Sequence, residues 1–195
     1  MNFLTFVFSY LCSQDPSRSF EIGGCVLPFC QRCTGLYVGL GISFIYLLLS
    51  GHYKKGLPPA NIIYVNIASL VIMPVFGFHF LDPGPAWRFW SGLIYGNAVA
   101  SLLLPAASII CSEGRVFGRY TKASVFGFFV CFAFLNTIPF WFPVQSSLFY
   151  YVVLILASTG FFCVLSCLIA IIVFLMKKMI VSLILKGFGN GYAKN

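Results

Sequence analysis

Long apolar stretches, separated by short polar breaks, dominate the pattern of this 195-residue chain. Five stretches are long enough to cross roughly 30 Å of hydrocarbon as helices, which takes about 20 residues. They run through residues 34–50, 61–81, 88–111, 123–142 and 147–176. Turn-forming sequences rich in Gly and Pro lie between several of them. The pattern predicts an all-α fold, a polytopic membrane helix bundle of about five transmembrane helices.

The two ends of the chain are predicted to behave differently from this bundle. Residues 1–33 form an outer N-terminal segment, the bundle covers 34–176, and 177–195 form a basic tail. The apolar start, Met1 to Leu11, is too short to span and lacks the features of a signal peptide, which predicts an interfacial or re-entrant segment. Lys177 and Lys178 follow the last span without a Gly or Pro, so one tilted helix is expected to continue into the cytoplasm.

Composition agrees with a lipid environment. Hydrophobic residues make up 60% of the chain and charged residues only 8%, whereas soluble domains carry roughly a quarter charged residues. The formal net charge of +8 is typical of basic cytoplasmic loops. Because no motif combines basic residues with stacking aromatic ones, we expect the lipid bilayer, and no nucleic acid, as partner.

The distribution of basic residues predicts the orientation in the cell membrane. With five spans, nine of the twelve Lys and Arg residues fall on one side: Lys54, Lys55, Arg115, Arg119, Lys122, Lys177, Lys178, Lys186 and Lys194. The other side holds Arg18, Arg32 and Arg88, matched by Asp15, Glu21 and Asp82. Positively charged loops stay in the cytoplasm, so the N-terminus is expected outside and the C-terminus inside.

A short motif occurs at the start of both the first and the third span. Thr34-Gly35-Leu36-Tyr37-Val38-Gly39 and Ser91-Gly92-Leu93-Ile94-Tyr95-Gly96 share the pattern hydroxyl-Gly-Leu-x-x-Gly. Glycines four apart lie on one helix face and allow close GxxxG-type packing of another helix. Polar residues inside the spans, such as Asn66, Asn97 and Asn136, either line a path or bond neighbouring helices.

An arginine precedes each copy of this motif, at Arg32 and Arg88. Both spans present their helix N-termini outward, where free N–H groups and the helix dipole favour anions. Together with Arg18 and Asp82, these residues are candidates for binding a small anionic ligand. The alternative is that the arginines form salt bridges, for example Arg88 with Asp82 or Arg18 with Asp15, or extend their side chains to the membrane surface.

Four of the eight cysteines crowd into the outer N-terminal segment: Cys12, Cys25, Cys30 and Cys33. Cys30-Gln31-Arg32-Cys33 is a C-x-x-C motif immediately before a predicted helix. Structural disulfides are expected on an oxidising face. The same cysteines suit zinc or another thiophilic metal, or thiol–disulfide exchange. Ordinary free thiols are the fourth interpretation.

Signatures of the common catalytic machineries are missing. The chain has no Ser-His-Asp order, H-E-x-x-H or P-loop, and its four acidic residues leave little material for acid–base catalysis. His79 lies near the outer end of the second span and is a further candidate ligand or proton carrier. Whether the protein is an enzyme stays open at this point.

The N-terminal motifs resemble a known family. The runs Leu11 to Phe20, Gly23-Gly24, and Leu27 to Gly39, with Asp82, Arg88, Gly92 and Gly96, are similar to the motifs of the domain-of-unknown-function 2085 family of membrane proteins. The resemblance covers roughly the first half of the chain. It implies a small helical membrane fold and a shared outer site, with no activity attached. Where the family has His after its first Cys, this chain has Ser13; if that His ligates metal in relatives, Cys25 would have to replace it here.

Three functions fit these observations. The first is an outward-facing Cys/Arg site for a small anionic ligand or a metal ion. The second is a structural or assembly subunit of a larger membrane complex, which the small-residue helix faces favour; a homo-oligomer is the other assembly expected and would count against this second function. The third is a membrane thiol–disulfide oxidoreductase in which Cys30 and Cys33 cycle.

Overall fold

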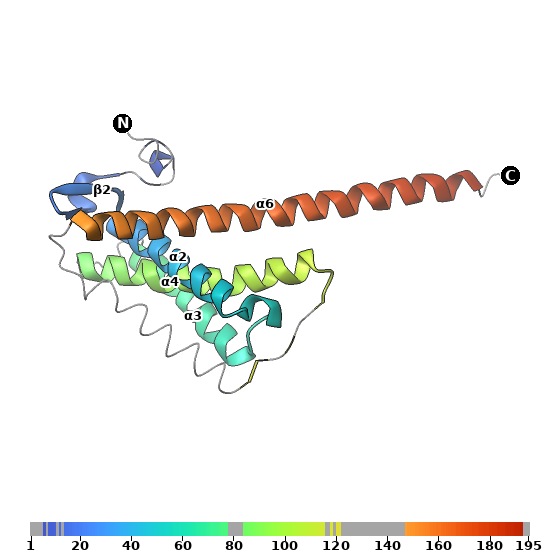
Figure 1. The fold of residues 1–195 in the computed structure, drawn as a ribbon, viewed down its shortest axis with the longest axis horizontal. Coiled ribbons are helices and arrows are strands. Elements are labelled where there is room, and N and C mark those ends of the chain that lie inside the picture. Colours follow the sequence, from blue (N-terminus) through green and yellow to red (C-terminus); the bar gives the residue numbers. More distant parts are fainter. Residues whose placement is uncertain are drawn as a thin grey trace.

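The computed structural model describes residues 14–77, 84–115 and 147–192, together with residues 6, 8–10, 12, 118, 120 and 121. This part of the chain is mostly helical (Figure 1). Its elements are η1 (Pro16–Arg18), β1 (Ser19–Ile22), β2 (Cys25–Cys30), α2 (Gln31–Leu49), η2 (His52–Lys55), α3 (Ala60–Gly77), α4 (Pro85–Cys111) and α6 (Ser147–Tyr192).

Three of these helices are long and apolar enough to cross a membrane: α2, α4 and the Ser147–Ser182 part of α6. The apolar stretch of α3, Ala60–Val75, is shorter. The predicted fourth span, 123–142, and the end of the second, 78–81, lie outside the described residues. In Figure 1, α2, α4 and α6 begin at the end of the molecule that carries β2 and run in the same general direction, while α3 returns.

Glycines hold α2 and α4 together. A Cβ atom at Gly35 would collide with the backbone of Phe89, and one at Gly92 would collide with the backbone of Arg32. The two contacts are equivalent. Gly35 meets the backbone three residues before Gly92, and Gly92 meets the backbone three residues before Gly35. The predicted role of the two hydroxyl-Gly-Leu-x-x-Gly motifs in close helix packing is confirmed.

Polar and small residues extend this packing toward the middle of the bundle. The Ser43 hydroxyl donates a hydrogen bond to the side-chain oxygen of Asn97 at 2.5 Å, and Asn97 is fully buried. Asn97 therefore bonds neighbouring helices. Gly41 in α2 and Gly160 in α6 approach each other so closely that a Cβ on either would meet the other helix's backbone. Asn136 lies outside the described residues.

The helix boundaries differ from the predicted spans in two ways that matter. The first helix begins at Gln31 instead of residue 34, so part of the C-x-x-C motif lies inside it. The last helix continues from Ser147 to Tyr192, which confirms that the chain stays helical through Lys177 and Lys178. At about 1.5 Å per residue its 46 residues extend well beyond the thickness of a bilayer core.

A small antiparallel hairpin covers the end of the bundle where α2 begins. Strands β1 and β2 pair Glu21 with Val26 and Ile22 with Cys25. The turn between them uses Gly23 and Gly24 with φ values of 58° and 75°, the left-handed conformation that two-residue hairpin turns require. The sequence prediction had no strand here, although Gly-Gly between short apolar runs is the usual hairpin signal.

Candidate metal centre

Phe8 anchors the N-terminal segment to the bundle. Its ring is fully buried and lies 4.9 Å from the ring of Phe29, 5.3 Å from that of Tyr37 and 5.4 Å from that of Phe161, between ring centroids. These partners belong to β2, α2 and α6 respectively. The segment predicted to be interfacial or re-entrant thus reaches the protein core at Phe8.

A single turn of chain connects this anchor to Cys12. The Cys12 N–H donates to the Phe8 carbonyl at 2.9 Å, the spacing of a helical turn. After Cys12 the chain reverses at Gln14, whose φ of 51° is unusual for a non-glycine residue. The Gln14 side-chain amide donates to the Pro28 carbonyl at 3.0 Å and so ties the turn to β2. Cys12 is therefore fixed from both sides.

The C-x-x-C motif lies across the start of α2. Cys30 ends β2 and is the N-cap residue of the helix, and Cys33 lies in the first turn. The Thr34 hydroxyl donates to the Cys30 carbonyl at 3.0 Å. Because one turn of helix separates the two cysteines, their side chains project toward the same side. The prediction that the motif stands before the helix is corrected by this observation: the helix starts one residue after Cys30.

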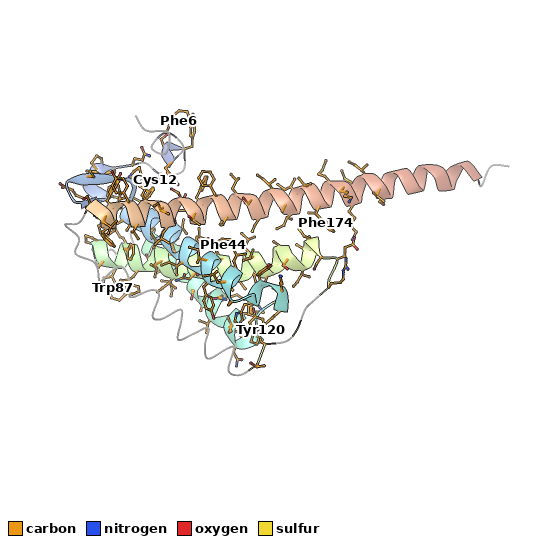
Figure 2. The ribbon with its side chains drawn as sticks, viewed as in Figure 1. Phe6, Cys12, Phe44, Trp87, Tyr120 and Phe174 are labelled. Carbon is orange, nitrogen blue, oxygen red and sulfur yellow. The ribbon has the colours of Figure 1, made fainter. Side chains whose placement is uncertain are left out.

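The two segments bring three sulfur atoms together. The Sγ atoms of Cys12, Cys30 and Cys33 all lie within 4.8 Å of one another. The Cys30 N–H donates to the Cys12 Sγ at 3.3 Å, and Cys12 is 8% exposed. Hydrogen bonds from the thiols of Cys30 and Cys33, with backbone N–H groups of Cys30 and Gln14, hold the pKa of Cys12 well below its usual range despite its burial. We call Cys12, Cys30 and Cys33 the sulfur cluster; it lies at the hairpin end of the bundle, where Figure 2 labels Cys12.

The sulfur cluster has the donor chemistry and spacing of a metal site. With Zn–S bonds of about 2.3 Å, the edges of a tetrahedral thiolate site are about 3.8 Å. The three sulfur atoms, within 4.8 Å of one another, need only small side-chain rotations to reach that spacing. All seven described cysteines are free thiols, so no disulfide in this part of the chain competes for these sulfurs.

Cys25 does not join the sulfur cluster. It is exposed at the start of β2 and pairs with Ile22 beside the hairpin turn. The idea that Cys25 takes the place of the family's histidine therefore has no support in this arrangement. Three further described cysteines, Cys111, Cys163 and Cys167, lie along α4 and α6.

Arg88 links α4 to the C-x-x-C motif. Its guanidinium donates to the side-chain oxygen of Gln31 at 3.2 Å, and Gln31 is the buried residue that directly follows Cys30. Arg32 occupies the next position, and its backbone carbonyl packs against Gly92. The two arginines predicted from the repeated motif therefore lie close to the sulfur cluster in the fold.

The other predicted ligand-binding residues lie elsewhere. Arg18 is paired with Asp15 at 3.7 Å on the surface, as the salt-bridge alternative predicted. Hydrogen bonds from the hydroxyl and the backbone N–H of Ser17 lower the pKa of the Asp15 carboxyl, and the charge of Arg18 adds a smaller effect in the same direction. Asp82 and His79 lie outside the described residues, so their part in an outer site stays a prediction.

The part of the chain that carries the sulfur cluster is also the part that matches known sequences. The family model described as predicted membrane protein (DUF2085) matches residues 12–102, from the first cysteine of the sulfur cluster into α4. A protein of Methanothermobacter thermautotrophicus is 33% identical over 102 residues, which is 49% of this chain and 86% of the relative. The chain belongs to the DUF2085 family.

Membership in DUF2085 confirms the resemblance seen in the motifs and the assignment to membrane proteins. The archaeal relative is described only as an uncharacterized protein. No solved structure matches the chain. The matched region ends inside α4, so α6 lies beyond the part of the chain that matches the family model.

Three residues of the site were not identified from the sequence: Phe8, Gln14 and Gln31. Phe8 and Gln14 act by docking and turning the segment that carries Cys12, and a single aromatic residue in an apolar run gives no signal of such a role. Gln31 lies inside the C-x-x-C motif, and its position between the two cysteines is the signal that the sequence offered; its burial is known only from the structure.

Proposed function

We propose that this DUF2085 protein is an integral membrane protein that binds a thiophilic metal ion, zinc or a softer ion, through Cys12, Cys30 and Cys33. The observation that carries the proposal is the convergence of three Sγ atoms within 4.8 Å from two separate segments of the chain. Thiolates favour Zn²⁺ and Cu(I) over the hard cations that oxygen ligands hold. The site also explains why a docked N-terminal segment precedes the hairpin.

The proposed site faces the outside of the cell in a protein of five spans. Support comes from the uneven distribution of basic residues, nine of twelve on one predicted side, and from the common direction of α2, α4 and α6. If the described basic residues near η2 and the end of α4 are cytoplasmic, the helix starts and the sulfur cluster are outside. The fourth span, predicted over residues 123–142 outside the described part of the chain, is part of this proposal.

The nearby arginines are proposed to offset the charge of the site. Three thiolates and a divalent ion together carry a net negative charge, which is costly at the edge of a low-dielectric bilayer. Arg88, held by Gln31 at 3.2 Å, and Arg32 place positive charge beside the C-x-x-C motif. A small anionic ligand, the other ligand expected here, would compete with the thiolates for the same arginines.

Metal binding by the purified full-length protein tests the proposal. Reduced protein in detergent is loaded with Zn²⁺ or Co²⁺, and bound metal is quantified by elemental mass spectrometry and by the Co²⁺–thiolate charge-transfer absorption. We expect one ion per chain in the wild type and in Cys25→Ser. Cys12→Ser and Cys33→Ser each remove a proposed ligand. Their affinity for the metal should fall by more than about 10- to 100-fold, which is the cost of losing a residue that only hydrogen-bonds a ligand.

Cys25→Ser is the matched control because Cys25 is an exposed cysteine five positions before Cys30 that lies outside the sulfur cluster. Equal loss of metal in Cys25→Ser and Cys12→Ser would mean that binding reflects exposed thiols in general. Absence of bound metal from the reduced wild type would reject the proposal outright.

Thiol–disulfide exchange is the second candidate, because Cys30 and Cys33 form a C-x-x-C motif at the start of α2 and their sulfur atoms lie within 4.8 Å of each other and of Cys12. In that reaction the Cys30 thiolate attacks a substrate disulfide, which forms a mixed disulfide and releases one substrate thiol. Cys33 or Cys12 then attacks the Cys30 sulfur, which forms a disulfide within the protein and releases the second substrate thiol. Differential alkylation, with and without reductant, decides between the candidates: a Cys30–Cys33 or Cys12–Cys30 disulfide in isolated protein favours exchange.

No separate observation favours the assembly-subunit function. The glycine faces that suggested a partner helix are used within the chain, since Gly35, Gly39, Gly92 and Gly96 pack between α2 and α4. Gly41 and Gly160 likewise join α2 to α6.

A further inference from the structure

We propose that Phe8 is the positioning residue of the metal site, and that the segment from Phe8 to Cys12 is a strap whose docking between β2, α2 and α6 delivers the third sulfur ligand. The inference rests on the proposed metal-binding function and deepens it by assigning how the site is completed.

Among the described aromatic residues near the strap in the sequence, only Phe8 faces the bundle. Phe8 is fully buried, whereas the aromatic neighbours Phe6 and Tyr10 are 47% and 76% exposed. Phe6 and Tyr10 contact each other edge to face at 5.3 Å between centroids. A single inward ring therefore provides the hydrophobic docking of the described part of this segment.

The aromatic seat of the strap is built by three other elements. Phe29 and Tyr37 contact Phe8 and also each other at 6.1 Å, and Tyr37 contacts Phe161 at 5.9 Å. These contacts remain when Phe8 is removed, because they join β2, α2 and α6 directly. The seat is therefore part of the bundle, and Phe8 is a separate group that fills it.

The geometry between seat and site is short and fixed. Phe29 immediately precedes Cys30, Tyr37 lies one turn after Cys33, and the Cys12 N–H bonds to the Phe8 carbonyl at 2.9 Å. Undocking of Phe8 would remove one of the two attachments of Cys12, leaving the bond of Gln14 to Pro28, and so would loosen the Cys12 sulfur relative to Cys30 and Cys33, which stay in place where β2 ends and α2 begins. The site has two ligands supplied by the bundle and one supplied by the strap.

Two readouts on the full-length protein in detergent test this assignment. In metal-free, reduced protein, Phe8→Ala should speed alkylation of Cys12, which is 8% exposed in the docked strap, while the exposed Cys25 serves as an internal reference whose rate does not change. In the Co²⁺-loaded protein, Phe8→Ala should lower affinity by about 10- to 100-fold and reduce the thiolate charge-transfer absorption per ion, as expected when two sulfurs remain in place of three.

Phe8→Leu and Phe20→Ala are the companion variants. Leu keeps an apolar side chain in the seat and should restore most of the affinity and slow labelling of Cys12. Phe20 is another aromatic residue of the hairpin end, but its ring contacts Phe89 at 5.9 Å, so Phe20→Ala should leave both readouts near wild type.

The outcomes separate this inference from the proposed function. Unchanged Cys12 labelling in Phe8→Ala, or an equal effect of Phe20→Ala, overturns the strap even if the wild type binds metal. A wild type that binds no metal rejects the proposed function, and the positioning role of Phe8 in a metal site fails with it. Faster Cys12 labelling together with weaker binding and an altered spectrum supports the inference.

Discussion

At the hairpin end of the bundle, three cysteine side chains converge from two segments to within 4.8 Å. At the other end, His52 of η2 is held away from any such cluster among the described residues. Its ring stacks on Tyr46 at 5.8 Å and lies 5.5 Å from the ring of Tyr120. Both its nitrogen atoms are buried without a hydrogen-bond partner in the described part of the chain.

The contrast shows that a good ligand type is not sufficient for a site. Imidazole is the commonest metal ligand, yet at η2 it is packed as an aromatic ring beside basic residues such as Lys55. Thiols, which often serve as small apolar core residues, are gathered into a ligand set because a strap, a strand end and a helix start meet there. Topology, more than residue type, determines at which end side chains of a ligand type gather among the described residues.

The glycine contact between α2 and α4 lies near the starts of both helices, at the hairpin end, and its disruption has the largest expected effect. Gly92→Leu would drive a side chain into the backbone of Arg32 and Leu36, beside the C-x-x-C motif, and we expect it to cost more than about 4 kcal/mol. The variant should fail to give monodisperse protein in detergent, measured by fluorescence-detected size exclusion.

Ala170→Leu is the control for this variant, since Ala170 is an exposed small residue on α6. It should elute like the wild type. A Gly92→Leu protein that is monodisperse and still binds Co²⁺ would show that the helix pair can separate without loss of the sulfur cluster.

The orientation of the two ends is open to a direct labelling comparison. Cys25 is exposed at the hairpin end, and Cys111 is exposed where α4 ends. In intact cells a membrane-impermeant maleimide should modify Cys25, and Cys111 should react only after permeabilisation. Peptide mass spectrometry reads both sites from one sample. The reverse pattern would place the sulfur cluster in the cytoplasm and overturn the predicted topology.

The sequence predicted the helices better than the site. Length and apolar composition located α2, α4 and α6 because the apolar surface of a membrane helix continues along its whole length, whether it faces other helices or lipid. Likewise, Gly35, Gly39, Gly92 and Gly96 predicted close packing because small residues four apart have few other uses in a membrane helix.

The composition of the sulfur cluster was predicted only in part. Cys12, Cys30 and Cys33 were among the four candidates, but sequence spacing could not separate them from Cys25. That separation depends on the hairpin turn at Gly23 and Gly24, which leaves the start of β2 exposed and carries its end to α2. Long-range docking of this kind, through Phe8, leaves no periodic pattern in the chain.

The smallest expected effect concerns His52. Burial, and secondly the charge of Lys55, lowers the pKa of its imidazole from the ordinary value of 6.5. The folded protein therefore binds a proton less readily than the unfolded chain, so this contribution to stability is complete above about pH 6.5 and declines as the pH falls below it. For one proton the slope cannot exceed about 1.4 kcal/mol per pH unit.

His52→Phe keeps a ring between Tyr46 and Tyr120 but removes the titration. Unfolding of metal-free protein, followed in detergent from about pH 5 to 8, should depend less on pH in this variant than in the wild type. The phenol of Tyr120, with its pKa raised to about 12 by burial, stays neutral throughout this range.

Lys55→Ala should weaken the pH dependence of stability because it removes the charge that opposes protonation of His52. The Lys54 ammonium lies over the Tyr53 ring, 5.5 Å from its centroid, so Lys54→Ala should change this dependence less. If His52→Phe retains the full wild-type slope, the pH response belongs to another group, and the burial of the His52 imidazole does not contribute to the pH dependence of stability.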